Sequence, residues 1–450
     1  MSPPEPLTVT DAAPLIRSGA LTPSDLLEQC LARVDVYEPA VKAWVYLDRE
    51  RARRDAARLT DELKQGHHRG PLHGIPVGIK DIIDVFDMPT GCGSKLWANS
   101  FARRDAACVE RLRQAGAVIL GKTVTTPYAF TDPPVTRNPW NLDRTPGGSS
   151  SGSAAAVACG MCLAALGTQT GGSLTRPASY CGVCSLKPTY GRVSVDGVLP
   201  LAPSLDHVGV IAGCVRDLAI VLQCIAGPVR WEDIGDPVPD CIRAVDQRIL
   251  SHTMLKVGGL FDELLSSDAS TMMNGAVKHI ESNWATVPSV VLPGSTSELL
   301  RAHRWIMACE SAAIHAERWE RLPDEYPPNI TALVQEGLSD TQPPNRSYLL
   351  HSELRRTVSG MLRRNHFFLT PATTDVAPTI ETTGNPVFNV PWSFTGMPTV
   401  SLPYARTPDG LPFAIQLAGG NHREDEVLRA AFWCEEEFQF PRTLPPIPSK

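Results

Sequence analysis

Residues 74–227 alternate between short apolar runs and helical patterns, and few fold classes accommodate such a chain. The runs "GIPVGIKDIIDV" and "CLAALGTQT", together with residues 117–120, have the length and apolar content of buried strands. Residues 105–114 and 153–158 have helical spacing, and a glycine follows each of them. The alternation predicts an α/β core in which helices flank a sheet.

Four segments follow from the pattern along the chain. Residues 1–70 are an N-terminal helical segment and residues 71–227 the core, whereas residues 228–364 are mostly helical and more polar. Strand patterns return in residues 365–440, in "HFFLTPATT", "GMPTVSLPYA" and "GLPFAIQLAGG". We therefore expect residues 228–364 to be an insertion within a single domain that spans residues 1–450.

The composition, 43% hydrophobic and 20% charged residues, is that of an ordinary globular protein. A net charge of −6 argues against a nucleic-acid-binding surface, which needs clustered lysine and arginine. The N-terminal segment lacks the pattern of a signal peptide, and the longest small-apolar run is too short to cross a bilayer. We expect a cytoplasmic protein without membrane contact, whose twelve cysteines are buried thiols.

Two short motifs match well-known sites but have simpler explanations. The stretch "GAVILGKT" matches the P-loop pattern, yet its four central residues predict a buried strand and not a phosphate-binding turn. The pairs Cys159–Cys162 and Cys181–Cys184 have the spacing of a zinc ribbon. Cys159 ends a predicted helix and Cys162 starts a predicted strand, so close packing of small thiols explains them better. Zinc binding remains an alternative.

The loop "NLDRTPGGSSSGSAAAVACG" contains three consecutive serines, and any of them is a candidate nucleophile. "GSSSG" fits the nucleophile-elbow pattern, with Ser150 as nucleophile and Asp206 and His207 as available partners. An elbow needs a strand directly before the serine, whereas "NPWNLDRTPGG" is a loop. The Ser150 hypothesis therefore lacks the strand that an elbow requires, although it also predicts a hydrolase.

A second serine, Ser173, follows another glycine pair in "GTQTGGSLTRPASYCGV". Lys80 lies in a short apolar strand, where desolvation would lower its pKa and make a neutral amine available as a base. Gly171 and Gly172 leave backbone N–H groups open for an oxyanion. The residues therefore favour serine acyl transfer with a lysine base. The alternative is a structural role, in which the glycines form a tightly packed turn and the lysine lies on the surface.

Along nearly its whole length the sequence resembles the amidase signature enzymes. The resemblance rests on an ordered series of segments: "GPLHGIPVGIKDIIDV", "DAACVERLRQAGAVILGKT", "NPWNLDRTPGGSSSGSAAAVACG", "GTQTGGSLTRPASYCGVCSLKPTYGRVS", "PLAPSLDHVG" and "GMPTVSLPYARTPDGLPFAIQLAGG". It implies a single large α/β domain with a mixed, twisted central β-sheet between helices. It also implies hydrolysis of a carboxylic amide without a cofactor, with carbamates and esters as further candidate substrates.

The family uses a Ser-Ser-Lys triad, which the resemblance transfers to this chain. Ser173 corresponds to the nucleophile, Ser149 to the bridging serine and Lys80 to the base. The backbone N–H groups of residues 170–173 (Thr170, Gly171, Gly172 and Ser173) correspond to the oxyanion hole. The resemblance further implies a cis peptide bond between Gly148 and Ser149, and it makes Ser150 and Ser151 loop residues.

The chain departs from the family pattern at two positions near Ser173. Gln169 stands where the family usually has Asp, and Thr175 where it usually has Arg, with Arg176 one place later. The negative charge at position 169 and the positive charge at position 175 are absent together, which indicates that the two positions changed as a pair. This departure indicates a subgroup of the family with its own substrates.

The substrate is expected to be a small amide, bound where loops and insertions surround the catalytic core. Residues 228–364 and the loop "PYAFTDPPVTRNPW" are the expected specificity regions, and Tyr128, Phe130 and Trp392 are candidate pocket residues that core packing would also explain. Two other functions remain: the A subunit of a tRNA-dependent amidotransferase, and a zinc-binding or non-catalytic scaffold protein. No nucleic-acid partner is expected, and a homo-oligomer is compatible with the sequence.

Overall fold

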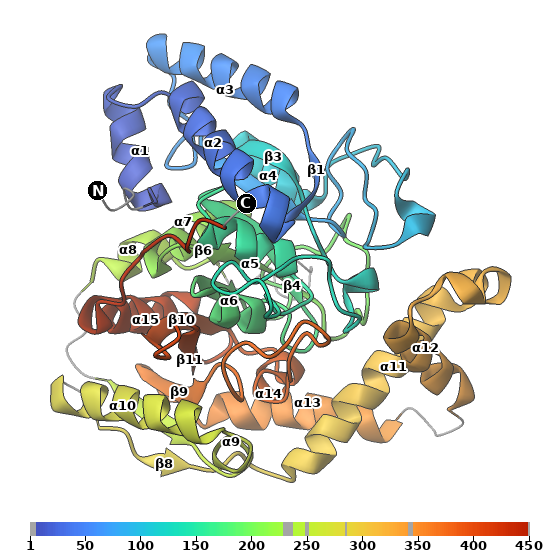
Figure 1. Ribbon diagram of the computed structural model, residues 1–450. Coiled ribbons are helices and arrows are strands. Elements are labelled where there is room, and N and C mark those ends of the chain that lie inside the picture. Colours follow the sequence, from blue (N-terminus) through green and yellow to red (C-terminus); the bar gives the residue numbers. More distant parts are fainter. Residues whose placement is uncertain (1–5, 228–236, 248–251, 284–285, 341–344, 449–450) are drawn as a thin grey trace.

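The computed structural model describes residues 6–227, 237–247, 252–283, 286–340 and 345–448 (Figure 1). The strands of this part of the chain form one eleven-stranded sheet. They are β1 (Trp44–Leu47), β2 (Pro76–Lys80), β3 (Val118–Thr123), β4 (Ala164–Gln169), β5 (Cys184–Lys187), β6 (His207–Ala212), β7 (Thr253–Val257), β8 (Ser289–Val290), β9 (His366–Pro371), β10 (Thr399–Arg406) and β11 (Pro412–Ala418).

The sheet is mixed, with the spatial order β1-β3-β2-β4-β6-β5-β10-β11-β9-β7-β8. β2 pairs in parallel with both β3 and β4, and β7 pairs in parallel with β8 and β9. The remaining pairs are antiparallel. β2 and β4 are therefore neighbours in the sheet, which brings Lys80 at the end of β2 near the segment that follows β4.

Helices cover both faces of the sheet (Figure 1). They are α1 (Val9–Ser18), α2 (Pro23–Val41), α3 (Arg49–Lys64), α4 (Ala107–Gln114), α5 (Ser151–Ala158), α6 (Thr175–Cys181), α7 (Val215–Ile225), α8 (Cys241–Val245), α9 (Leu260–Glu263), α10 (Ser267–Asn283), α11 (Thr296–Arg321), α12 (Pro328–Ser339), α13 (Asn345–Gly360), α14 (Val390–Phe394) and α15 (Glu424–Phe438). α5 packs on α6, and α7, α8 and α15 pack together. No helix in the described part of the chain is long and apolar enough to cross a membrane.

Alternate residues of the central strands enter two different apolar clusters, as expected for a sheet buried on both faces. On β3, Ile119 belongs to one cluster, whereas Val118 and Leu120 belong to the other. On β4, Leu166 belongs to the same cluster as Ile119, and Ala165 belongs to the other cluster. This explains why these strands read as continuous apolar runs and not as alternating polar and apolar residues.

The central elements predicted from the sequence are present, with shifted ends. The strand expected over residues 117–120 spans Val118–Thr123, and the helix expected over residues 153–158 begins earlier, at Ser151. The lysine of the P-loop-like stretch, Lys122, is buried on β3, and its Nζ lies 3.1 Å from an oxygen of Asp81. The match to the P-loop is therefore a strand with a buried ion pair, not a phosphate-binding turn.

The described part of residues 228–364 contains helices, and it also contributes two strands to the sheet edge, β7 and β8. Within this stretch the structure describes residues 237–247, 252–283, 286–340 and 345–364. α11 and α12 project from the body of the molecule in Figure 1. The segment is thus part of the central sheet as well as a helical addition to it.

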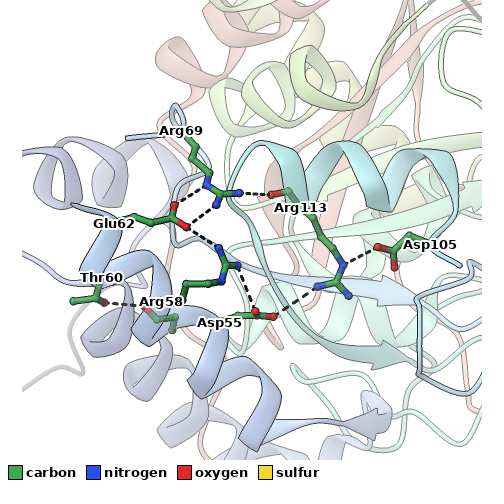
Figure 2. A network of polar contacts seen from close by, with 8 residues as sticks. Asp55, Arg58, Thr60, Glu62, Arg69, Asp105 and Arg113 are labelled. Atoms are coloured by element: carbon green, nitrogen blue, oxygen red, sulfur yellow. Dashed lines mark hydrogen bonds and ion pairs between the residues drawn. The ribbon is translucent and has the colours of Figure 1, made fainter. Parts of the chain in front are cut away.

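A network of ion pairs joins α3 to α4 and the loop between them, as Figure 2 shows. Glu62 on α3 accepts from Arg69 at 2.6 Å and from Arg58 at 2.7 Å. Arg113 on α4 contacts Asp105 at 2.8 Å and Asp55 on α3 at 3.7 Å. Because these side chains share partners and are partly buried, the network holds the N-terminal helices against the core more firmly than an isolated surface pair would.

Candidate active site

Lys80 occupies the last position of β2, and its side chain is fully buried. Its Nζ donates to Ser149 Oγ at 2.6 Å and to Thr168 Oγ1 at 2.7 Å. Burial lowers the pKa of Lys80 well below its ordinary value, and the negative charge of Asp206 opposes this shift only in part. The site therefore contains an amine that gives up its proton more readily than an exposed lysine does, in contact with a serine hydroxyl.

Ser149 lies in the loop directly before α5 and is also buried. The Gly148–Ser149 peptide bond is cis, as the family resemblance implies. The carbonyl oxygen of Ser149 accepts from the backbone N–H of Thr126 at 3.2 Å, which ties the loop to the segment after β3. The Ser149 hydroxyl is thus held beside Lys80 by the loop backbone and by the Lys80 hydrogen bond.

Ser173 lies between the end of β4 and the start of α6, and 8% of its surface is exposed. Its carbonyl oxygen accepts from the backbone N–H of Ser150 at 3.3 Å, so the two serine-bearing loops are adjacent. Ser173 lines a cavity of about 350 Å³ together with Thr170, Gly171 and Gly172. Among the described residues, none accepts a hydrogen bond from the backbone N–H of residues 171–173. These donors are therefore available to an oxygen atom bound in the cavity.

Gln169 supports the loop that carries Ser173. Its Oε1 accepts from the backbone N–H of Leu174 at 2.9 Å and of Thr175 at 3.1 Å, and its Nε2 donates to Ser393 Oγ at 3.1 Å. The Ser393 hydroxyl in turn donates to the carbonyl oxygen of Gly171 at 2.8 Å. Gln169 therefore contacts the backbone of position 175, the other position that departs from the family pattern.

The elbow hypothesis for Ser150 has no support in the geometry. Ser150 Oγ is buried and bonds to the backbone of Thr168, at 3.2 Å from its nitrogen and 3.3 Å from its oxygen. His207 Nδ1 faces the carbonyl oxygens of Leu205 and Gln169, at 2.7 Å and 3.2 Å. Burial lowers the pKa of His207 well below its ordinary value. Ser150 Oγ and His207 Nδ1 thus both have backbone partners, whereas His207 Nε2 is buried and has no partner among the described residues.

Asp206, the other partner in that hypothesis, accepts hydrogen bonds from residues other than Ser150 and His207. Its carboxylate accepts from the Thr170 hydroxyl and from the backbone N–H groups of Leu201 and Ala202. Burial raises its pKa to about 6, although these hydrogen bonds favour the charged form. Asp206 therefore ties residue 170, at the start of the glycine pair, to the turn after residue 200.

The three aromatic pocket candidates divide between the cavity and the core. Phe130 lines the cavity with Ser173. Tyr128 is buried outside the cavity lining, and its ring stacks on Tyr326 with 4.8 Å between centroids. Trp392 is fully buried in the core, where it stacks on the rings of Phe261 and Phe368.

Sequence reasoning does not assign Arg176, His303 and Arg304 to the cavity, yet all three line it. His303 Nε2 lies 3.0 Å from the carbonyl oxygen of Thr170, which brings α11 against the glycine loop. From the sequence, Arg176 is notable only because it stands one place after the usual arginine of the family. No local pattern predicts that residues of α11 lie next to the loop after β4.

The four cysteines with zinc-ribbon spacing are buried at the ends of different elements. Cys159 follows α5, Cys181 ends α6 and Cys184 begins β5, while Cys162 precedes β4. Burial raises the pKa of each thiol. Within the described ranges, no group of three or more histidine, cysteine, aspartate or glutamate side chains could hold a metal ion. The spacing therefore reflects packing at element ends, and the geometry does not support the zinc alternative.

Comparisons with known proteins agree with one another. AmiD of Mycobacterium tuberculosis is 32% identical over an alignment of 469 positions, which covers 98% of this chain and 96% of AmiD. The A subunit of the glutamyl-tRNA(Gln) amidotransferase of Desulfatibacillum aliphaticivorans is also 32% identical, over 96% of this chain and 98% of its own length. The crystal structure of the peptide amidase of Stenotrophomonas maltophilia superimposes with a TM-score of 0.85 at 26% identity, covering 98% of this chain and 99% of that enzyme.

The family model described as Amidase matches residues 25–428. That range contains the whole central sheet, both serine-bearing loops and Lys80. The ordered sequence segments, the mixed eleven-stranded sheet and the matches over nearly the full length lead to the same assignment. This chain belongs to the amidase family.

Proposed function

We propose that this protein is an amidase that hydrolyses a carboxylic amide through an acyl-enzyme on Ser173. The observation that carries the proposal is the buried contact of 2.6 Å between Lys80 Nζ and Ser149 Oγ, beside the loop that bears Ser173. A buried amine in its neutral form is a base, and a hydroxyl bonded to that base can pass on a proton from a nucleophile that reaches it.

In the proposed acylation, Ser173 Oγ attacks the carbonyl carbon of the amide and transfers its proton to Ser149. Ser149 at the same time gives its own proton to neutral Lys80. The tetrahedral intermediate collapses as Lys80 returns a proton, through Ser149, to the leaving nitrogen, and the C–N bond breaks. Ammonia or an amine departs, and the acyl group remains esterified to Ser173.

Deacylation repeats these steps with water as the nucleophile. Water loses a proton through the same relay, its oxygen attacks the ester carbon, and Ser173 leaves with that proton. The backbone N–H groups of residues 170–173 are the proposed oxyanion donors in both steps, because those of residues 171–173 have no acceptor among the described residues. Atoms and charge balance with the amide substrate, one water molecule and the three side chains of the relay.

The A subunit of an amidotransferase is the second candidate, and the 32% identity to such a protein favours it. That enzyme would use the same relay to free ammonia from glutamine within a complex. The exchange at Gln169 and Thr175 argues for the free-standing amidase, whose substrate is a small amide. Hydrolysis of simple amides by the purified chain alone would favour the amidase, and a requirement for partner proteins would favour the alternative.

The test is a library of amides screened for release of ammonia or amine. Ser173→Ala should reduce kcat/KM by at least about a thousandfold while the protein stays folded. Ser150→Ala is the matched control, since it removes a buried hydroxyl next to Ser149 but outside the relay. It should keep most activity and lose stability of about 1–3 kcal/mol, because the Thr168 backbone loses its partner. Reversed results would establish Ser150 as the nucleophile.

A further inference from the structure

The glycine loop, residues 170–173, has hydrogen bonds at its carbonyl oxygens but free N–H groups at three positions. The N–H groups of residues 171–173 have no acceptor among the described residues, whereas all four carbonyl oxygens of the loop accept a hydrogen bond. In a trans peptide unit the C=O and the N–H point in opposite directions. The donors at the carbonyl oxygens therefore lie on the other side of each peptide unit from an oxygen atom that binds its N–H.

Two of these donors are side chains from distant parts of the chain. His303 Nε2, on α11, lies 3.0 Å from the carbonyl oxygen of Thr170. The Ser393 hydroxyl, on α14, donates to the carbonyl oxygen of Gly171 at 2.8 Å. The carbonyl oxygen of Gly172 accepts from the backbone N–H four residues later, at 3.0 Å. Each peptide unit that presents a free N–H thus has a hydrogen bond at its own carbonyl oxygen.

His303 is an uncharged donor in its contact with the loop. A carbonyl oxygen can only accept, so the proton of the contact belongs to His303 Nε2. The residue is 4% exposed, and burial lowers the pKa of His303 to about 4. The imidazole is therefore neutral at neutral pH, with its proton directed at the carbonyl oxygen of Thr170.

Gln169 fixes the direction of the Ser393 hydroxyl. Because Gln169 Oε1 accepts from the backbone N–H groups of Leu174 and Thr175, the other end of the amide is the Nε2 donor, and it donates to Ser393 Oγ at 3.1 Å. A hydroxyl has one proton, so a serine that accepts from an amide gives that proton to its remaining partner. For Ser393 this partner is the carbonyl oxygen of Gly171.

We propose that His303 and Ser393 are positioning residues of the oxyanion hole, which polarise the peptide units of the Gly171 and Gly172 N–H groups and thereby strengthen these donors. A hydrogen bond at a carbonyl oxygen draws electron density from the amide, so the N–H of the same peptide unit becomes more positive. Negative charge develops on the substrate oxygen only in the transition state, so the effect falls on kcat more than on KM. The roles of both residues rest on the proposed function and extend it to α11 and α14.

The first test removes the His303 donor. In His303→Leu, kcat for the amide that the wild type hydrolyses fastest should fall about tenfold, with KM changed less than about threefold, because loss of a whole oxyanion donor costs about a hundredfold or more. His303→Gln has an amide N–H₂ at the end of a side chain of comparable length, and its kcat should return to within about threefold of wild type. Equal kcat in wild type and His303→Leu, or an equal loss in both variants, would overturn the assignment.

His73 is the matched control for a buried histidine. Its Nε2 also lies 2.9 Å from a backbone carbonyl oxygen, that of Leu59 on α3, and the residue is 1% exposed and outside the cavity lining. His73→Leu should destabilise the protein as His303→Leu does and leave kcat within about twofold of wild type. A loss of kcat as large as that of His303→Leu would show that general loosening of the fold sets the rate, and it would refute the role of His303.

Ser393 is tested in the same way. Ser393→Ala should lower kcat about tenfold, and Ser393→Thr, which keeps a hydroxyl, should stay within about threefold of wild type. Thr395→Val is the control from the same helix, because Thr395 Oγ1 donates to the carbonyl oxygen of Pro391 at 2.7 Å and not to the glycine loop. An equal loss of kcat in Thr395→Val and Ser393→Ala would contradict a specific role for Ser393.

The closing experiment detects the polarisation without a substrate. The dipeptide Thr-Gly occurs four times in the chain, at residues 90–91, 170–171, 383–384 and 395–396. In protein with carbonyl-¹³C threonine and ¹⁵N glycine, an NMR spectrum that correlates the two nuclei across the peptide bond contains one signal for each pair. Thr170→Ser removes the label at position 170 and so identifies its signal.

His303→Leu should move the carbonyl carbon of Thr170 and the amide proton of Gly171 upfield, and further than the other three pairs, because the carbonyl oxygen loses its donor. His303→Gln should return the signal toward its wild-type position. An unmoved signal in His303→Leu, or the same displacement in both variants, overturns the assignment. If no amide is hydrolysed, the proposed function fails, whereas this spectrum still decides whether His303 polarises the glycine loop.

Discussion

Replacing Lys80 by methionine removes the proposed base and keeps an unbranched side chain of similar length at the end of β2. Two results are expected together. The loss of general-base catalysis should lower kcat/KM by about 10²–10⁴-fold. We expect the wild-type rate to rise with pH as Lys80 loses its proton, and this rise should be absent from the variant. The stability of the protein should also change its dependence on pH, and this second effect is measurable without a substrate.

The size of the second effect follows from the burial of Lys80. Its pKa is well below the ordinary value in the folded protein, mainly through desolvation, and returns to about 10.4 on unfolding. Between these two pKa values the unfolded chain binds one more proton, so the free energy of unfolding rises with pH. The rise is at most about 1.4 kcal/mol per pH unit. Methionine has no such dependence, so the stability of the wild type relative to Lys80→Met should increase from pH 7 to pH 9.

Urea unfolding of both proteins at pH 7, 8 and 9 measures this difference directly. Lys187→Met is the matched control, because Lys187 is fully buried, its pKa is also well below the ordinary value, and its Nζ donates to the Met397 carbonyl oxygen at 2.6 Å, outside the site. Lys187→Met should show the same trend in stability and retain hydrolysis.

The reasoning would be refuted if wild type and Lys80→Met had parallel stability curves over this pH range while Lys187→Met diverged. Lys80 would then carry a proton in the folded protein, and it could not accept one from Ser149. A wild-type rate that is flat from acidic to alkaline pH would contradict the lysine base independently.

Three further predictions concern the linked exchange, the ion-pair network and the metal hypothesis. Gln169→Asp should lower the free energy of unfolding by about 3 kcal/mol, because it buries an uncompensated carboxylate. Adding Thr175→Arg to that variant should recover at least about 1 kcal/mol in a double-mutant cycle, and strict additivity of the two effects would contradict the linked exchange. Arg113→Gln should cost about 1 kcal/mol in urea unfolding at low salt and less at high salt, whereas an unchanged midpoint would mean that the network joining α3 to α4 contributes nothing to stability. Dialysis against a strong chelator should leave amide hydrolysis within twofold, and a loss that zinc restores would revive the metal hypothesis.

Much of the fold is predictable because it depends on short-range patterns. The strand period, the apolar content and the glycines that end helices identify β2, β3 and β4 and the helices between them. Element ends differ by a few residues, since the hydrogen bonds that decide them come from neighbouring strands. β7 and β8 escape prediction in a segment that reads as helical, because a two-residue strand such as β8 has no period to detect and forms only through its partner.

Lys80, Ser149 and Ser173 are candidates from the sequence alone, through their local patterns and the family resemblance. Lys80 and Ser149 lie far apart in the chain, and their contact exists because β2 and β4 are neighbours in the sheet. The aromatic candidates cannot be separated in advance, because Phe130 at the cavity and Trp392 in the core have the same apolar character. For the same reason the sequence reveals a charge at Arg176 but not its unused donors: whether a cation has a partner depends on which distant side chains fold against it, and only the tertiary structure decides that.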